Sequence, residues 1–238
     1  MERINYDNLM ETIIMENREK KVVPTLLLHT CCAPCSSAVI ERLSRDFKIT
    51  VFYYNPNIEP YEEYLKRKEE QKKFLKVFPS PNPLNFLDCD YENEKFREMT
   101  LGLETEKEGG PRCFRCYHLR LLKTALKAKE LGFDYFTTSL SISPYKNAQK
   151  LNEIGLELEK ECGVSYLVSD FKKNDGYKKS ILFSKEYNLY RQDYCGCVYS
   201  KKERDESITH CARKENGRVD DPPLLPEKRK KYNSLCRL

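Results

Sequence analysis

Short apolar runs alternate with amphipathic stretches along the first 170 residues of the chain. Five runs are rich in β-branched, aromatic or leucine residues and are bounded by turn-forming residues, as strands are. The predicted strands are 22–29, 49–54, 84–87, 135–140 and 165–168. In the intervening stretches apolar residues recur every three or four positions, which is typical of one helix face. The predicted helices are a stretch that contains 38–43, then 61–78, 113–130 and 147–161.

This alternation predicts the fold class. Strands separated by helices of ten or more residues need crossover connections, so the sheet is expected to be mostly parallel and covered on both faces. We therefore predict a three-layer α/β fold. A single catalytic domain is expected over 1–200, and the charged, proline-containing segment 201–238 is expected to be an appendage.

Composition excludes some classes of protein. No apolar run among the 238 residues approaches the roughly 18 needed to span a bilayer, and the first twenty residues do not resemble a secretory signal. We therefore expect a cytoplasmic protein that does not enter membranes. The net charge is +5, and most of it lies in 201–238, which holds eleven Lys or Arg against seven Asp or Glu. This tail is either a solvated end or a contact for phosphates.

Cysteine is the unusual residue of the composition. There are eleven cysteines, and seven of them fall into three tight groups. The groups are Cys31-Cys32-x-x-Cys35, Cys113-x-x-Cys116 and Cys195-Gly-Cys197. In a reducing compartment, clustered cysteines are more often metal ligands or redox catalysts than disulfides. The other four cysteines are interpreted as ordinary packing or surface thiols.

The predicted topology places the first of these groups and a Ser/Thr-rich segment where ligands gather. In open α/β sheets, binding sites lie beyond the carboxyl ends of the strands. Cys31, Cys32 and Cys35 directly follow the first strand, and the Ser/Thr-rich segment 137–144 straddles the end of the fourth. Cys113 and Cys116 occupy the first turn of a predicted helix, where backbone N–H groups favour thiolates.

Residue spacing alone leaves three interpretations open. Thiolate ligands indicate zinc or an iron–sulfur cluster, and either needs four sulfurs. A zinc-stabilised RNA-binding module fits the two CxxC pairs, although the gap between Cys35 and Cys113 is long for such a module. A thioredoxin-like dithiol oxidoreductase fits a strand, then Cys32-Ala-Pro-Cys35, then a helix. In the remaining interpretation, all these thiols are packing residues.

Five motifs, in order, make the sequence similar to a known family. They are LLLHTCCAPCSS, FYYNPNIEPYEEYLKR, GGPRCFRCYHLRL, TTSLSISPYKN and YRQDYCGCVYSK. Together they resemble the QueH-type epoxyqueuosine reductases from about residue 24 to about residue 200. The resemblance implies a fold similar to the adenine-nucleotide α-hydrolase (PP-loop-like) superfamily. The loop 30–36 contains no glycine, unlike a pyrophosphate-binding loop, so we expect it to bind a metal centre and not to support ATP hydrolysis.

The resemblance also implies an activity and a set of ligands. The family removes the epoxide oxygen of epoxyqueuosine, at the wobble position of tRNA, by a two-electron reduction that gives queuosine. Carried over to this chain, Cys31, Cys32, Cys113 and Cys116 are the expected ligands of a [4Fe–4S] cluster. The Cys195-Gly-Cys197 element is either a redox-active dithiol or a pair of ligands for an additional iron beside the cluster. Cys35 either packs at the helix start or replaces one of the four ligands.

The reaction also needs proton donors and partners. Tyr145 and Asp193 are predicted catalytic residues, and Tyr54 and Ser141 are further candidate donors near the strand ends. His29 is either a donor to cluster sulfur or a hydrogen-bonded structural residue. The expected partners are tRNA and an electron donor of unknown identity, and we expect the chain to be a monomer.

Overall fold

The computed structural model describes residues 4–215, with side chains described as far as residue 209. The chain divides into two compact units, Met1–Arg191 and Gln192–Leu238. The expected appendage 201–238 lies outside the described residues from 216 onward. In the described part, no helix is both long and apolar enough to cross a bilayer.

The first unit is built on a parallel sheet of five strands in the order β3-β2-β1-β4-β5. The strands are β1 (Thr25–His29), β2 (Lys48–Phe52), β3 (Asn85–Leu87), β4 (Tyr135–Thr138) and β5 (Ser165–Tyr166). All four neighbouring pairs are parallel; in the central pair, Leu28 of β1 lies opposite Val51 of β2. The predicted α/β class is therefore confirmed. The narrower likeness to the PP-loop-like superfamily stays a prediction.

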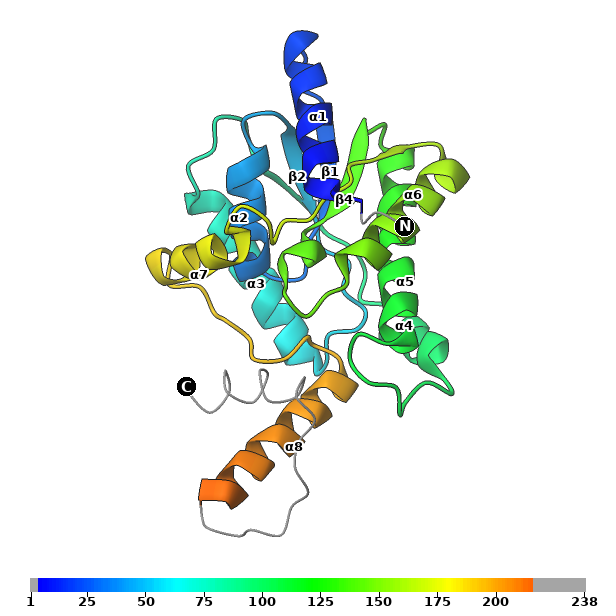
Figure 1. Ribbon diagram of the computed structural model, residues 1–238, viewed down its shortest axis with the longest axis vertical. Coiled ribbons are helices and arrows are strands. Elements are labelled where there is room, and N and C mark those ends of the chain that lie inside the picture. Colours follow the sequence, from blue (N-terminus) through cyan, green and yellow to red (C-terminus); the bar gives the residue numbers. More distant parts are fainter. Residues whose placement is uncertain (1–3, 216–238) are drawn as a thin grey trace. The chain divides into compact units, whose positions relative to one another are not determined.

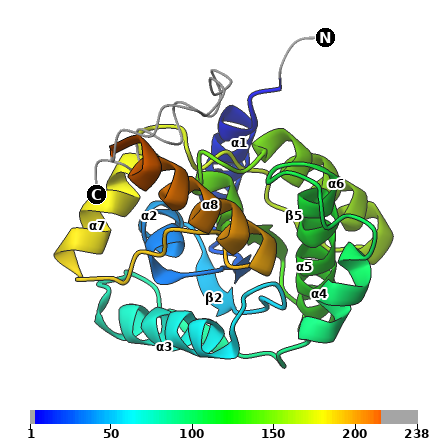
Figure 2. The ribbon, with the colours of Figure 1, turned by 90° about the horizontal axis from the view of Figure 1, so that it is seen from below.

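Helices cover both faces of this sheet (Figure 1, Figure 2). One face is packed by α5 (Pro111–Glu130) and α6 (Ala148–Cys162), and α4 (Asn93–Thr100) packs on α5. The other face is packed by four helices. These are α1 (Tyr6–Glu19), α2 (Ala33–Leu43), α3 (Tyr61–Val77) and α7 (Gly176–Glu186).

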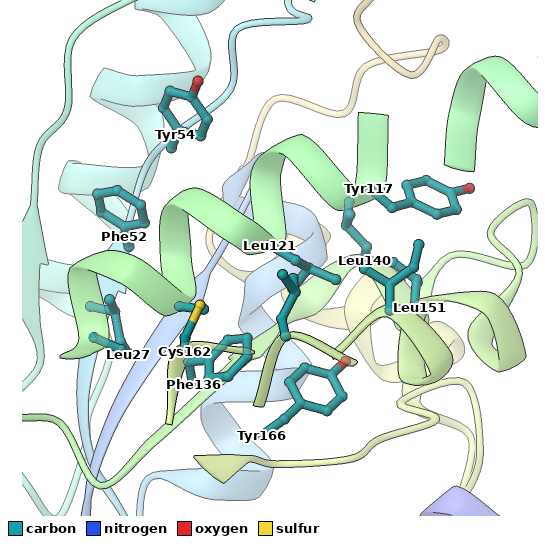
Figure 3. Packing of buried hydrophobic residues seen from close by; sticks show 14 of the residues in the cluster. Leu27, Phe52, Tyr54, Tyr117, Leu121, Phe136, Leu140, Leu151, Cys162 and Tyr166 are labelled. Atoms are coloured by element: carbon teal, nitrogen blue, oxygen red, sulfur yellow. The ribbon is translucent and has the colours of Figure 1, made fainter. Parts of the chain in front are cut away.

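The alternation of side chains along β1 separates the two layers of the core. Leu27 packs with the α5 and α6 side, whereas Leu26 and Leu28 pack with the α1 and α2 side, because neighbouring strand residues point to opposite faces. Figure 3 shows the first of these layers. Its labelled members include Leu27, Phe52, Leu121, Phe136, Leu151 and Tyr166.

Some expected elements differ from the observed ones. The strand expected over 135–140 ends at Thr138, where the Thr138 hydroxyl accepts a hydrogen bond from the Leu140 amide and a 3₁₀ helix, η1 (Ser139–Ile142), begins. The sequence interpretation did not include α1, α4 or α7. The apolar residues 181–183 lie inside α7.

The second unit is described only over 192–215, where it consists of the Cys195–Cys197 segment and the helix α8 (Val198–Glu215). This helix was also not predicted. Within it Arg204 pairs with Asp193 and Asp205, so the start of the helix is tied to the segment before it.

The topology determines where a site can form. The connections leave β1 in opposite directions, because β2 and β3 follow on one side and β4 and β5 on the other. In such doubly wound sheets, ligands bind at this switch point, beyond the carboxyl ends of the strands. Here the switch point lies between β1 and β4, and the residues that leave it are Thr30–Cys32 and Ser139.

Candidate metal centre

Three cysteines converge at the carboxyl end of β1. The Sγ atoms of Cys31, Cys32 and Cys35 all lie within 4.8 Å of one another, and Cys31 and Cys32 are 3.7 Å apart. Cys31 and Cys32 are buried and Cys35 is half-buried. No cysteine in the described part of the chain forms a disulfide. Three thiols at this spacing could share one metal centre.

The local sequence explains why these sulfurs meet. Cys32 is in an extended conformation (φ −172°) immediately before α2, and a proline in the first turn favours helix initiation at this point. Cys35 lies in that first turn, so the chain folds back and its side chain reaches the two preceding cysteines. Sequence interpretation left the role of Cys35 open, whereas the structure groups it with Cys31 and Cys32.

The three thiols share their protons unequally. Hydrogen bonds from the Cys32 and Cys35 thiols, together with the positive charges of Arg120 and Arg67, hold the pKa of Cys31 well below its usual value. Burial and the neighbouring Cys31 raise the pKa of Cys32 to about 12. The group therefore favours one thiolate at Cys31, the form of cysteine that binds metals.

A glutamine from α3 braces this cysteine loop. Gln71 is fully buried, and its Oε1 accepts hydrogen bonds from the hydroxyls of Thr30 (3.3 Å) and Ser36 (2.9 Å). Thr30 and Ser36 flank the cysteines at the two ends of the loop. Gln71 thereby joins the end of β1, the start of α2 and α3.

The second cysteine group lies at the start of α5. Cys113 and Cys116 are each 8 % exposed, and Cys113 belongs to the same buried cluster as Cys31 and Cys32. The Gly109 amide donates to Cys113 Sγ over 3.2 Å. Gly109 has φ +92°, a conformation that L side chains rarely adopt, so glycine at this position allows the amide to point at the sulfur.

The loop before α5 is held by a buried arginine. The Arg112 guanidinium donates to the carbonyls of Leu103, Glu104 and Glu106. Glu108, in the same loop, pairs with Lys146 at 3.0 Å, and both side chains are largely buried. The loop that leads to Cys113 is therefore held in place by two interactions, the hydrogen bonds of Arg112 and the ion pair of Glu108.

A polar network connects the two cysteine groups through Arg120. Its Nη1 lies 3.9 Å from Cys116 Sγ, its Nε 3.3 Å from Nε2 of His29, and its Nη2 2.7 Å from Oδ1 of Asn55. Asn55 in turn donates to the carbonyl of Thr30 over 2.8 Å. Since Thr30 is next to Cys31, the network runs from the first cysteine group to the second.

His29 is a structural member of this network. It is fully buried, its Nδ1 is 2.9 Å from the Thr138 hydroxyl, and its Nε2 is 3.1 Å from the Tyr54 carbonyl. Burial and the Arg120 charge lower the pKa of His29 to about 3, so the ring is neutral. Because Nε2 accepts from Arg120, Nδ1 carries the ring proton and donates to Thr138, so His29 joins β1 to β4 and to α5, with the Tyr54 carbonyl as a neighbour of Nε2.

The candidate proton donors lie in different surroundings. Tyr54 is buried, and its hydroxyl donates to Glu92 over 2.8 Å; burial and the Glu92 carboxylate raise the pKa of Tyr54 well above its usual value. Ser141 is buried and its hydroxyl is 3.1 Å from that of Ser169. Tyr145 is 47 % exposed.

The remaining predicted site residues belong to the second unit. Asp193 pairs with Arg204, and Cys197 Sγ lies 3.4 Å from both the hydroxyl and the amide of Ser200. Gly196 has φ +127°, so glycine is what allows the chain to turn between Cys195 and Cys197.

Three buried residues that surround the cysteines, Arg67, Gln71 and Arg120, were not predicted from the sequence. Arg120 lies one helical turn beyond Cys116, and this i,i+4 spacing was a usable signal. Arg67 and Gln71 share a face of α3 at the same spacing, among the charged and polar positions of that helix. Both side chains are buried.

The comparisons with known proteins agree on one family. The family model of the epoxyqueuosine reductase QueH matches residues 26–203. Epoxyqueuosine reductase QueH of Streptococcus pyogenes is 45 % identical over 203 residues, which cover 84 % of this chain and 80 % of that protein. The same-named protein of Staphylococcus aureus is 41 % identical, with 84 % and 85 % covered. That of Thermotoga maritima is 38 % identical, with 80 % and 97 % covered.

Proposed function

This chain belongs to the QueH family of epoxyqueuosine reductases, and we propose that it performs this reduction with an iron–sulfur cluster held by its buried cysteines. The reaction converts epoxyqueuosine in tRNA to queuosine. Two C–O bonds of the epoxide break and a C=C bond forms, and the oxygen leaves as water. Two electrons and two protons are consumed.

The observation that carries the cofactor proposal is the convergence of cysteine sulfurs at the switch point of the sheet. Cys31, Cys32 and Cys35 are mutually within 4.8 Å, and Cys113 lies in the same buried cluster. Soft thiolate ligands without histidine or carboxylate favour iron–sulfur chemistry or zinc. Because the established reaction is a reduction, an electron-carrying centre fits it and zinc does not, since zinc has no redox chemistry.

We propose Cys31, Cys32, Cys113 and Cys116 as the four ligands, with Cys35 as a further candidate because its Sγ lies within 4.8 Å of those of Cys31 and Cys32. When bound, such a cluster supplies electrons one at a time at low potential. The chain's own residues do the rest. Gln71 and Asn55 hold the cysteine loop through Thr30, and the Gly109 amide holds Cys113.

Protons must reach the departing oxygen from the chain or from water. Tyr145 is one proposed donor, because it is exposed and sits in the segment that follows η1. Asp193 is proposed as a second. Tyr54 is less suited, since its proton is already engaged with Glu92. Cys195 and Cys197 are proposed as a redox dithiol or as ligands of an additional iron.

A direct experiment tests the function. The anaerobically reconstituted protein is incubated with dithionite and tRNA that carries epoxyqueuosine, and the digested nucleosides are analysed by mass spectrometry. We expect a product lighter by one oxygen atom. The proposal would be contradicted if protein that contains iron and sulfide, present in excess over the tRNA, left the epoxyqueuosine intact. A protein that loads only zinc would contradict the cofactor part.

A further inference from the structure

Two arginines are buried around the cysteine groups. Arg67 of α3 and Arg120 of α5 are each 1 % exposed. Burying a guanidinium is costly unless other groups compensate its charge and its N–H donors. Arg67 has such a partner in Glu63, at 2.7 Å. Arg120 instead donates to residues of the candidate metal centre.

The three donor positions of Arg120 point to three different parts of the site. Nη1 is directed at Cys116 Sγ, Nε at His29 and Nη2 at Asn55. Cys116 is four residues away on the same helix, whereas His29, 91 residues away, ends β1, and Asn55, 65 residues away, lies in the loop after β2. The planar guanidinium therefore fixes α5 and Cys116 against the ends of β1 and β2.

This placement has an electrostatic consequence that rests on the proposed function. A [4Fe–4S]²⁺ core with four thiolates carries a net charge of −2, and one-electron reduction makes it more negative. A buried cation at the edge of this centre stabilises the reduced state more than the oxidised one. Hydrogen bonds to ligand sulfur act in the same direction, because they withdraw charge from the sulfur.

We propose that Arg120 is a positioning residue that raises the reduction potential of the cluster and holds Cys116 in its ligating position. In reduction, the cluster takes one electron from the donor that the reductase reaction already requires, and Arg120 loses no proton.

Two substitutions separate the charge of Arg120 from its hydrogen bonds. Arg120→Gln removes the charge and keeps an amide donor. Arg120→Lys keeps the charge, but its single ammonium cannot reach Cys116, His29 and Asn55 together. Lys129→Met is the matched control, because Lys129 is an exposed cation on the same helix.

The readout is the midpoint potential of the reconstituted cluster, followed by EPR in an anaerobic redox titration with dithionite. Iron and sulfide per chain are measured on the same samples. For Arg120→Gln we expect the equilibrium for reduction to become at least tenfold less favourable, a shift of about 59 mV to lower potential for one electron. Arg120→Lys is expected to lie between this value and the wild type. Lys129→Met should match the wild type.

The outcomes distinguish this inference from the proposed function. If the wild-type protein binds no iron and sulfide, both are overturned. If the wild type carries the cluster but neither Arg120 variant changes its potential, only the role of Arg120 is overturned. If Arg120→Gln does not load a cluster, Arg120→Lys decides: a potential below that of the wild type supports the role, and an unchanged one contradicts it.

Discussion

Arg120 donates from Nη2 to Oδ1 of Asn55 over 2.7 Å, in a part of the core where both side chains are only 1 % exposed. Asn55 also contacts the cysteine loop, because its Nδ2 donates to the carbonyl of Thr30. The Asn55 side chain thus accepts a hydrogen bond from the buried Arg120 guanidinium and donates one to the backbone of the cysteine loop.

The first prediction concerns Asn55. Asn55→Ala removes the hydrogen bonds of Asn55 to Arg120 and to Thr30. Because the Thr30 carbonyl is buried and loses this donor, the free energy of unfolding should fall by about 3 kcal/mol. Urea denaturation measures the change. Asn8→Ala, at an exposed position of α1, should change it by less than about 0.5 kcal/mol. Equal effects of the two variants would show that the Asn55 bridge contributes nothing.

A second prediction concerns the buried ion pair in front of α5. Lys146→Met removes the Lys146 side of the buried pair with Glu108, and breaking a buried pair from one side costs about 3 kcal/mol. Because Glu108 precedes Gly109, whose amide contacts Cys113, the variant should also load less iron.

The control for this variant is Lys150→Met. Lys150 pairs with Glu153 at a similar distance, 3.1 Å, but both side chains are more than a third exposed, so the loss should stay below about 1 kcal/mol. Unfolding by urea and the iron content are compared for both. A Lys146 variant that is as stable and as iron-rich as the Lys150 variant would refute the role of the pair.

The elements of the fold were partly readable from the sequence. All five strands of the sheet were predicted, because buried parallel strands are short apolar runs with turn residues around them. Helices α1 and α7 were not, although Met10, Ile14 and Phe183 pack into the core. In α1, Met10, Ile13 and Ile14 recur at helical spacing, so this helix was a signal in the sequence that the prediction missed.

The site was predictable where it depends on local spacing and not where it depends on distant contacts. The three cysteine groups are visible as sequence motifs, and the proline before Cys35 indicates a helix start. The partners of Arg120 lie 65 and 91 residues away, and Gln71 meets Thr30 across 41 residues. Such pairings follow from the strand order, which the sequence pattern did not specify.

The third prediction uses three buried or half-buried tyrosines. Burial and the Glu59 carboxylate raise the pKa of Tyr91 to about 12, and burial also raises the pKa of Tyr54 and Tyr64. In the unfolded chain a tyrosine ionises near pH 10. Above that pH the folded state binds more protons than the unfolded state, so stability decreases as pH rises.

The contribution of Tyr91 is therefore fully present below about pH 10 and is lost as pH rises through about 12. The free energy of unfolding, measured in urea from pH 8 to pH 12, should fall over this window. For Tyr91→Phe, the free energy of unfolding should fall less steeply with pH. The variant should also be less stable at every pH, because it lacks the hydrogen bond from the Tyr91 hydroxyl to the Ile58 carbonyl. Identical slopes for the two proteins would contradict the assignment.

A fourth prediction concerns the second unit. Cys197→Ser should retain most cluster iron and lower the turnover of epoxyqueuosine in tRNA by at least about a hundredfold, since a proposed redox thiol is removed. The control is Cys162→Ser, a buried cysteine at the end of α6, which should keep both iron and turnover. Undiminished turnover of the Cys197 variant would remove the Cys195–Cys197 pair from the mechanism.

The central claim is that cysteines from the end of β1 and from the start of α5 together hold one iron–sulfur cluster. The most direct test is the content of iron and acid-labile sulfide per chain after oxygen-free reconstitution of the wild type and of Cys113→Ser. We predict about four of each in the wild type, as in a [4Fe–4S] cluster, and the loss of most of both in the variant. A wild type without iron and sulfide, or a variant that retains the full content, would contradict the account.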